Sequence, residues 1–263
     1  IHTDQNVFNL PSTFRLIGPL QVGPLRQSVD DLVDRHEILR TTFSSIDGEP
    51  RQIIADKLSV EVPIRECLGL SEAERAALIR EVFLEERGFR FELAQGPLLR
   101  VRLLRFSDDD HCLVLNLHHT IHDAWSLEVI VRDLVALYEA ARTGHEPELP
   151  ALRVQYADYA HWQRQLLEGS AGREQMEYWK NQLSHLPPAL PLPTDYPRPA
   201  NQTFRGARES LLLPDHLLAS LRSLNRQEGT TVFMVLVAAL QFLLHRLTGT
   251  RDILVGSPVA GRD

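Results

Sequence analysis

The chain has 263 residues, of which 43% are hydrophobic and 24% charged, a composition typical of a folded globular protein. A net charge of -7 without any run of lysines or arginines argues against nucleic acid or an anionic membrane as a partner. The two cysteines, Cys67 and Cys112, lie outside any C-x-x-C pattern, which predicts neither a disulfide framework nor a cysteine zinc site. This cysteine usage fits a reducing compartment, so we expect a cytoplasmic protein. The most apolar run, 232–240, is too short to span a bilayer, so no membrane segment is expected.

Strand-like and helix-like patterns alternate over the first 117 residues. Apolar residues at helical spacing predict a helix after Pro24, and a capping box at Ser71 and Glu74 predicts a second helix that runs towards Gly88. The pair Asp47-Gly48 is typical of a hairpin turn. Strands are expected at 14–17, 51–54, 58–64, 98–106 and 112–117.

Helical patterns predominate in the second half. Helices are expected at 124–143, 155–167 and 174–186, with a polar loop at 144–150. The proline-rich stretch 187–199 cannot continue a helix and favours extended backbone, as a crossing between domains would. Beyond it we expect a strand at 210–213, a helix opened by Pro214, a mostly buried helix at 232–247 that ends near Gly249, and a strand at 253–255.

The candidate chemistry is concentrated between the strand at 112–117 and the helix that starts at Ala124. Three imidazoles and a carboxylate occur there within six residues: His118, His119, His122 and Asp123. Asp123 is placed to cap the helix, with Ser126 three positions on. A helix N-terminus disfavours a protonated histidine just before it, so we expect neutral imidazoles at cellular pH.

Three interpretations of this cluster are open. The residues can be ordinary turn and cap residues. His118 and His122 are also four apart, as in the zinc motif H-E-x-x-H, but His119 stands where that motif needs glutamate, and the segment resembles a turn more than a helix. In the third interpretation, His119 performs acid/base or positioning work on a substrate. The cluster alone does not decide between these.

Three separated stretches carry a resemblance to one family. Arg35 to Phe43 matches R-H-E-x-L-R-T-x-F, His118 to Ser126 matches H-H-x-x-x-D-x-W-S, and Tyr156 to Trp162 is similar to Y-x-D-[FY]-A-x-W. The stretches 91–100 and 252–258 are also similar to that family. In this order, the chain resembles the condensation domains of nonribosomal peptide synthetases over essentially its whole length.

The resemblance implies an α/β sandwich fold: a lobe like that of chloramphenicol acetyltransferase over 1–186, a crossing over 187–200, and the beginning of a second, pseudo-equivalent lobe over 201–263. It also implies a tunnel between the lobes, with the histidine motif at its floor. Donor and acceptor would be thioesters on the phosphopantetheine arms of upstream and downstream peptidyl carrier domains, and the acceptor amine would attack the donor carbonyl to form an amide. An adenylation domain is expected next to the domain in the same polypeptide. No directly bound cofactor, no metal and no homo-oligomer are expected.

The resemblance also implies roles for five residues. A free α-amine has a pKa near 8, so making it neutral at pH 7 costs only about 1.4 kcal/mol, and His119 is better used to position the amine and accept its proton after attack. His118 is expected to orient the loop. Asp123 is expected to be structural and paired with Arg40, the alternative being that Arg40 simply ends a helix at a favourable dipole position. Ser126 is expected to support Asp123.

Several aromatic residues of these motifs are expected to be structural. Trp125 is predicted to lie in the core, and Tyr156, Asp158 and Trp162 are predicted to pack and cap.

The sequence also departs from the family pattern. Glycine is frequent where this chain has Ala124, and a small residue is frequent where it has His122. The family's opening motif and the rest of the second lobe are absent, so we expect this piece alone not to be a competent catalyst.

Other functions stay open within the resemblance. They are a catalytically silent condensation-like module that recruits a partner protein, an epimerisation domain, and an acyltransferase that uses coenzyme A. A heterocyclisation domain is disfavoured, because in that class aspartate replaces the histidine pair.

Overall fold

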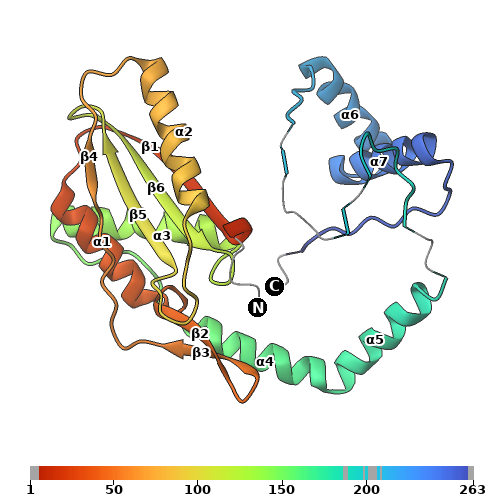
Figure 1. Cartoon of the computed structure of the whole chain (residues 1–263), viewed down its shortest axis with the longest axis horizontal. Coiled ribbons are helices and arrows are strands. Elements are labelled where there is room, and N and C mark those ends of the chain that lie inside the picture. Colours follow the sequence, from red (N-terminus) through yellow and green to blue (C-terminus); the bar gives the residue numbers. More distant parts are fainter. Residues whose placement is uncertain (1–5, 186–188, 198, 201–205, 208, 260–263) are drawn as a thin grey trace. The chain divides into compact units, whose positions relative to one another are not determined.

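A computed structural model describes residues 6–185, 189–197, 199–200, 206–207 and 209–259 of the chain (Figure 1). Its contacts divide the chain into two compact units, Ile1–Ser170 and Ala171–Asp263. The division proposed from the sequence, with a crossing at 187–200, stays a prediction, and residues 186–188, 198 and 201–205 of that region lie outside the described residues.

A four-stranded sheet forms the centre of the first unit. Its strands, in spatial order, are β1 (Asn9–Ile17), β6 (Asp110–His118), β5 (Leu99–Arg105) and β4 (Ile64–Glu66). Strand β6 pairs antiparallel with both β1 and β5, while β4 pairs parallel with β5. The predicted pair of strands leading into the histidine motif is therefore confirmed.

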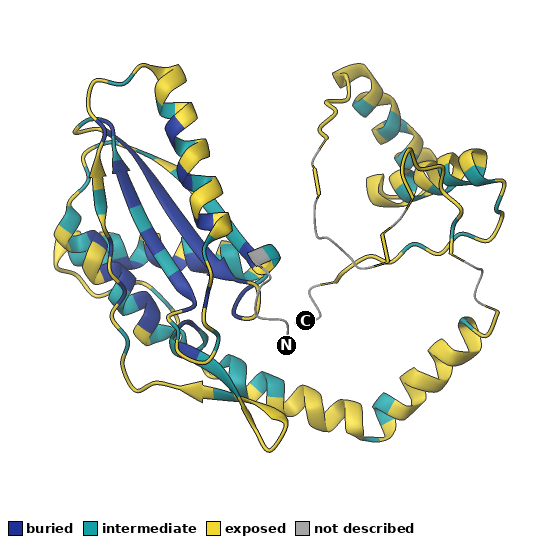
Figure 2. Cartoon of the chain, viewed as in Figure 1, coloured by how far each residue is buried: buried dark blue, intermediate teal, exposed yellow. Residues whose placement is uncertain are grey.

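Helices cover both faces of this sheet. Helices α1 (Val22–Arg35) and α3 (Ala124–Thr143) share a buried cluster with Leu113, Leu115 and Leu117 of β6, and α2 (Glu72–Gly88) packs against Cys112 and Val114 on the other face. Every residue of β6 is buried (Figure 2). This explains why the sequence of β6 reads as a continuous apolar run, since a strand covered on both faces has no solvent side.

A two-stranded hairpin lies beside the sheet. After a 3-10 turn at Glu37–Arg40, β2 (Thr41–Ile46) and β3 (Glu49–Ile54) pair antiparallel around Asp47 and Gly48, which both have positive φ. The predicted turn is confirmed, because two successive positive φ values are what a type I′ hairpin requires. His36, the residue between α1 and the 3-10 turn, has extended backbone and ends α1.

The strand expected at 58–64 is wrong for most of its length, since only Ile64 belongs to β4. Val60 and Val62 are buried in the core, but the segment is held by side-chain contacts rather than by a ladder: Asp30 accepts hydrogen bonds from Ser59 and from the Val60 backbone. The apolar residues of this segment predicted its burial correctly. Whether the segment forms a strand depends on which neighbouring strand can pair with it, and hydrophobicity does not specify this.

Helix ends in this unit follow the sequence signals. Ser71 and Glu74 form the predicted capping box at the start of α2, and Gly144 ends α3 in the left-handed conformation. Helix α4 (Tyr156–Glu168) follows the predicted loop, and a short 3-10 helix, Asn6–Phe8, precedes β1. The helices predicted at 124–143 and 155–167 thus begin and end within one residue of their expected positions.

The second unit contains helices α5 (Ser170–Gln182), α6 (Asp215–Glu228) and α7 (Val232–Thr248). Helix α7 ends at Gly249 as expected, but the prediction that it is mostly buried is wrong, since it contains no buried residue (Figure 2). Phe242, for example, is 65% exposed. The strands expected at 210–213 and 253–255 are also absent from the described residues. An isolated apolar run has nothing to pair with there, and a strand needs a partner.

Among the described residues no single helix is long and apolar enough to cross a membrane. Helices α6 and α7 pass that test of length and composition only together, with a bend of 104° between them.

Candidate active site

The histidine loop, His118 to Asp123, joins β6 to α3. Asp123 is the N-cap of α3: one carboxylate oxygen accepts from the Ser126 backbone N–H at 2.8 Å and from the Ser126 hydroxyl at 2.6 Å. The predicted cap and the predicted support from Ser126 are therefore both present. The loop is held at one end by the sheet and at the other by the first turn of a 20-residue helix.

His118 is buried against aromatic side chains. Its ring lies 5.9 Å from the Phe91 ring in an edge-to-face arrangement and 6.1 Å from the Phe8 ring, measured between centroids. Its Nδ1 accepts from the Thr120 backbone N–H at 3.3 Å and lies 2.9 Å from the Thr120 hydroxyl. Its burial and these contacts suit the predicted orienting role.

His119 turns the other way and is exposed. Its backbone N–H donates to the Phe8 carbonyl at 2.8 Å, which links the loop to the residue before β1. Its ring Nδ1 lies 2.9 Å from the His122 carbonyl oxygen. Because a carbonyl only accepts, Nδ1 must carry the hydrogen, and in the neutral ring Nε2 then carries the lone pair.

His122 is buried beneath this arrangement, and its Nδ1 donates to the His118 carbonyl at 3.3 Å. Burial lowers the pKa of both His118 and His122, because taking an imidazole out of water disfavours its charged form, and the charge of His119 acts in the same direction. The expectation of neutral rings thus agrees in direction for these two residues. Its main cause is loss of solvation rather than the helix dipole.

The R-H-E motif connects helices rather than entering the histidine loop. Asp133 of α3 is completely buried and accepts from Arg35 at 3.0 Å and from His36 at 2.9 Å, while Arg132 contacts its other oxygen. Burial first, and then the charges of Arg35 and Arg132, lower the pKa of His36, although Asp133 opposes this. The motif therefore ties the end of α1 to the middle of α3.

Arg40 lies at the end of the 3-10 turn and contacts the last turn of α1. Its guanidinium donates to the carbonyls of Val33, Asp34 and Ala55 at 2.8–3.1 Å, and it lies 3.6 Å from Glu37. These contacts favour the alternative that Arg40 stabilises a helix end, because a cation suits the carbonyl end of a helix. Its pairing with Asp123 stays a prediction.

The predictions for the aromatic residues of the motifs have different outcomes. Tyr156 and Trp162 pack as predicted, since the Tyr159 ring lies 6.0 Å from the Tyr156 ring and 5.6 Å from the Trp162 ring, between centroids. Trp125 is 59% exposed, so its predicted place in the core is wrong, and Trp162 is also exposed. Asp158 does cap α4, since its carboxylate accepts from the Gln155 backbone N–H at 2.9 Å. A tryptophan at the first turn of α3 sits on the side facing solvent, which the periodicity of so short a stretch did not specify.

Two other features concern possible metal binding and the position of a cavity. Among the described residues, no three His, Cys, Asp or Glu side chains converge as a metal ion would require. A cavity of about 540 Å³ lies between α1, α3 and the loop that follows α3, away from the histidine loop. Its lining residues are Asp31, Asp34, Arg35, Leu137, Glu146, Pro147, Leu149, Leu152 and Gln155.

Sequence reasoning missed a set of buried polar residues around the histidine loop, notably Glu86, Asn116 and Asp133. Each interrupts an apolar pattern: Asn116 stands within the run Cys112 to Leu117, and Asp133 stands on the face of α3 that carries Ile130 and Leu134. A polar residue on an otherwise buried face needs a partner, and this was the available signal.

Comparisons with known proteins agree with the fold and the motifs. The family model described as "Condensation domain" matches residues 1–263. The chain is 42% identical over 256 residues to phosphinothricin tripeptide synthetase PhsC of Streptomyces viridochromogenes, covering 97% of this chain and 24% of that protein. It is 37% identical over 257 residues to malpibaldin synthetase of Mortierella alpina, covering 97% and 5%. It thus spans only a small part of these relatives.

Solved structures extend the similarity to three dimensions. The crystal structure of SgcC5 from Streptomyces globisporus matches all of this chain with a TM-score of 0.79 and 32% identity, and 59% of that protein is covered. The X-domain from teicoplanin biosynthesis matches 91% of the chain with a TM-score of 0.78 and 32% identity, and 52% of that protein is covered.

Proposed function

The chain belongs to the condensation domain family of nonribosomal peptide synthetases, which has the chloramphenicol acetyltransferase-like fold, and from this premise we propose that it forms amide bonds with His119 as the catalytic residue. The observation that carries the proposal is the orientation of the His119 ring. Its Nδ1 is hydrogen-bonded to the His122 carbonyl, so in the neutral ring the lone pair is on Nε2, and His119 itself is exposed. A proton acceptor at the surface of the loop is what the reaction needs.

The proposed reaction joins an acceptor amine to a donor thioester. The amine nitrogen attacks the thioester carbonyl, giving a tetrahedral intermediate with a cationic nitrogen and an oxyanion. Nε2 of His119 accepts a proton from that nitrogen, the carbon–sulfur bond breaks, and the imidazolium returns the proton to the leaving thiolate. Holding both reactants in place contributes at least as much as the proton transfer, since positioning converts a bimolecular step into a unimolecular one.

The proposed substrates are acyl and aminoacyl groups on the phosphopantetheine arms of two carrier domains, with an adenylation domain as neighbour. Within the chain the proposed roles follow the contacts: His118 orients the loop through Phe8 and Phe91, and Asp123 and Ser126 hold it to α3. The exposure of His119 supports a position on a substrate channel, because a ring enclosed by side chains could not reach two tethered groups.

The test compares His119→Ala with His145→Ala, a matched control that removes an exposed histidine from the loop after α3. Both variants are made in the native protein and assayed for amide formation between loaded carrier domains. We expect at least a hundred-fold loss for His119→Ala and less than a two-fold change for His145→Ala. A near-normal rate for His119→Ala would contradict the proposal.

A second candidate is suggested by one neighbour. The X-domain from teicoplanin biosynthesis is solved in complex with OxyB and matches this chain with a TM-score of 0.77 and 32% identity. If this chain is instead a silent, partner-recruiting module, the unmodified protein will form no amide in the same assay. Formation of a D-configured product or use of a coenzyme A thioester would identify the epimerisation or acyltransferase alternatives.

A further inference from the structure

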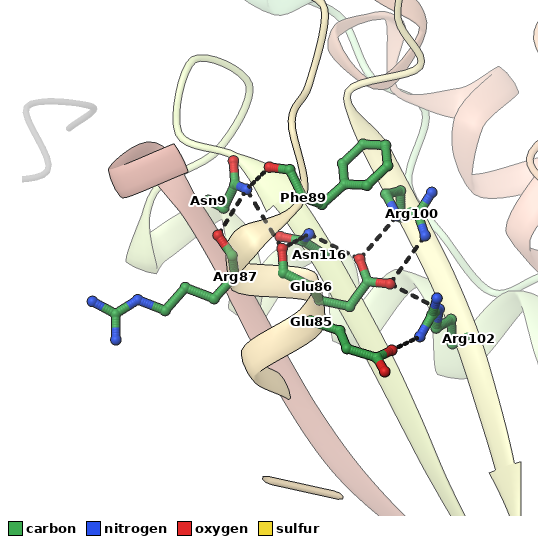
Figure 3. Close-up of polar contacts among 8 residues, drawn as sticks. All are labelled: Asn9, Glu85, Glu86, Arg87, Phe89, Arg100, Arg102 and Asn116. Atoms are coloured by element: carbon green, nitrogen blue, oxygen red, sulfur yellow. Dashed lines mark hydrogen bonds and ion pairs between the residues drawn. The ribbon is translucent and has the colours of Figure 1, made fainter. Parts of the chain in front are cut away.

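Glu86 occupies an unusual position at the end of α2. Its side chain is buried against the sheet and contacts two arginines of β5 (Figure 3): it accepts hydrogen bonds from Arg100 at 2.9 and 3.1 Å and forms an ion pair with Arg102 at 2.8 Å. Arg102 also pairs with Glu85, which balances the second positive charge. The amide of Asn116 on β6 donates to the same carboxylate at 3.0 Å. The proposed reaction uses none of these groups.

The backbone of Glu86 is a second point of convergence. The Asn116 amide donates to its carbonyl at 2.7 Å, and the Asn9 amide of β1 donates to it at 3.4 Å. Asn9 also donates to the carbonyls of Arg87, at 3.1 Å, and Phe89. The last carbonyls of a helix have no partner within the helix, and here side chains from two strands satisfy them. These five residues, Asn9, Glu86, Arg100, Arg102 and Asn116, are called the Glu86 cluster below.

The same two strands carry the histidine loop. Asn9 faces His118 in the β1–β6 register, and the residue before Asn9, Phe8, provides the carbonyl that accepts from the His119 N–H at 2.8 Å. Asn116 lies two residues before His118 on β6, so their side chains point to the same face of the sheet. The cluster therefore holds both backbone segments that place His119.

An aromatic path joins the cluster to the loop as well. The Arg100 guanidinium lies over the Phe89 ring at 3.8 Å from its centroid, Phe89 packs edge-to-face on Phe91 at 5.0 Å, and Phe91 packs in the same way on His118. A displacement of Arg100 would change the support under His118.

The energetics favour a positioning role over a purely stabilising one. Burial raises the pKa of the Glu86 carboxyl, but hydrogen bonds from Arg100 and Asn116 and the two arginine charges outweigh this, so its pKa is lowered and the group is ionised. Burying an ion pair costs so much solvation that an apolar replacement is often equally stable. Both oxygens of the Glu86 carboxylate are paired, whereas the buried side-chain oxygen of Asn116 has no hydrogen-bond partner among the described residues. A buried polar network of this kind does, however, favour one arrangement of the elements that it joins.

We propose that Glu86 is a positioning residue for His119, acting through Asn9, Asn116 and the Phe89–Phe91 pair to set the place of the histidine loop. This inference rests on the proposed function of His119. The end of α2 carries none of the imidazoles of the histidine loop. In this proposal it nevertheless contributes to the rate of amide formation, through Glu86.

The first test is Glu86→Gln, which keeps the shape of the side chain but removes the charge and turns an amide N–H₂ towards arginine donors. The matched control is Asp110→Asn. Asp110 pairs with Arg15 and Arg75 at the other end of β6, eight residues before His118 and about 26 Å away along the strand. In the native protein, at saturating loaded carriers, we expect kcat to fall about ten-fold for Glu86→Gln, with an unchanged KM for the carriers, and less than two-fold for Asp110→Asn.

Two further measurements separate positioning from general destabilisation. In the His119→Ala background, Glu86→Gln should cause no further loss, because Glu86 acts through His119. Asn9→Ser leaves the buried charges intact and removes only the amide from β1; we expect a fall in kcat of about three-fold, and this variant decides the question if Glu86→Gln fails to fold.

Equal kcat values for the wild type, Glu86→Gln and Asn9→Ser would overturn the inference, and so would a further ten-fold loss in the His119→Ala background. These outcomes differ from failure of the proposed function, in which His119→Ala itself retains activity.

Discussion

Helix α2 contacts the sheet through a polar cluster near each of its ends, and the two clusters differ in depth. Near its start, Arg75 meets Asp110 of β6 at 2.6 Å, and the same carboxylate pairs with Arg15 of β1 at 3.0 Å; this trio is called the Asp110 cluster. Near its end, Glu86 meets Asn116 of β6 and Asn9 of β1. Each cluster thus joins the same three elements. The Asp110 side chain is 11% exposed and one of its partners, Arg15, is 64% exposed. The Glu86 side chain is 2% exposed, and its partners Arg100 and Arg102 are each 30% exposed, so the Glu86 cluster is the more deeply buried of the two.

The difference separates two uses of charge. An exposed ion pair contributes little, commonly below 1 kcal/mol, and tolerates movement because water replaces a lost contact. A buried one allows no such replacement, so the elements around it have one acceptable arrangement. The more buried Glu86 cluster lies at the end of β6 that continues into the histidine loop, and the more exposed Asp110 cluster lies at the end that forms a surface turn. The stricter arrangement thus lies next to the loop that carries His119, the residue proposed to react.

The largest effect on stability is expected from a substitution in the Glu86 cluster. Glu86→Ala leaves Arg100 without its carboxylate and Arg102 with Glu85 alone, and we expect it to lower the free energy of opening of the sheet by about 3–5 kcal/mol. Hydrogen exchange of β6 peptides in the native protein, followed by mass spectrometry, measures this opening. A loss below 1 kcal/mol would mean that water reaches the site and that the two clusters are equivalent.

Gly96, in the loop from α2 to β5, tests the same end of the sheet without touching a charge. It has a φ of +62°, and a Cβ there would lie 2.9 Å from the Thr42 methyl carbon. We expect Gly96→Ala to cost about 2 kcal/mol, from the left-handed backbone and from the contact.

The second variant needed is Gly96→Ala combined with Thr42→Ser, measured by the same exchange experiment. Removing the methyl group should return the part of the loss that comes from the contact and leave the part that comes from backbone conformation. Full recovery would show that backbone strain at Gly96 is negligible.

As the pH falls, the protein should lose the stabilisation that depends on His118 and His122 before it loses the stabilisation that depends on Glu86 and Asp110. His118 and His122 have lowered pKa values because of burial, so the unfolded chain takes up their protons at a higher pH than the folded chain does. Their stabilisation is therefore present above about pH 6.5 and is lost as pH falls through the folded values, by at most about 1.4 kcal/mol per pH unit for each proton. The lowered pKa values of Glu86 and Asp110 place their losses below about pH 4.5 and pH 3.8.

The half-buried His36 and the buried His111 also have lowered pKa values, so they contribute to the same loss of stability as the pH falls. A variant is therefore needed to isolate the contribution of the histidine loop. His122→Asn removes one titrating group next to the loop. The slope of stability against pH between about 7 and 5 should become shallower in this variant, and an unchanged slope would show that His122 is already protonated in the folded protein at neutral pH or is not buried.

The smallest effect on stability is expected from a substitution in the Asp110 cluster. Asp110→Asn should lower stability by about 1 kcal/mol or less, and salt at about 1 M should reduce the difference from the wild type because exposed charges are screened. A loss of stability as large as that of Glu86→Ala, or one that salt does not change, would contradict the difference proposed between the two clusters.

Local features of this protein followed from the sequence because each depends on residues a few positions apart. The capping box at Ser71, the hairpin turn at Asp47, the cap at Asp123 and the passage from β6 through the histidine loop to α3 were all predicted correctly. The motif order also indicated the family, which the comparisons confirm.

The tertiary structure decided the rest, because burial and partnership depend on how distant segments pack. Glu86 meets Asn9 across 77 positions and Asn116 across 30, and no local pattern contains that information. For the same reason Trp125 is exposed although it is large and apolar, and residues 58–63 lie outside any strand ladder. Chain-local hydrogen bonds can be read from neighbouring residues, whereas a buried charge acquires its partners only when helices and strands come together.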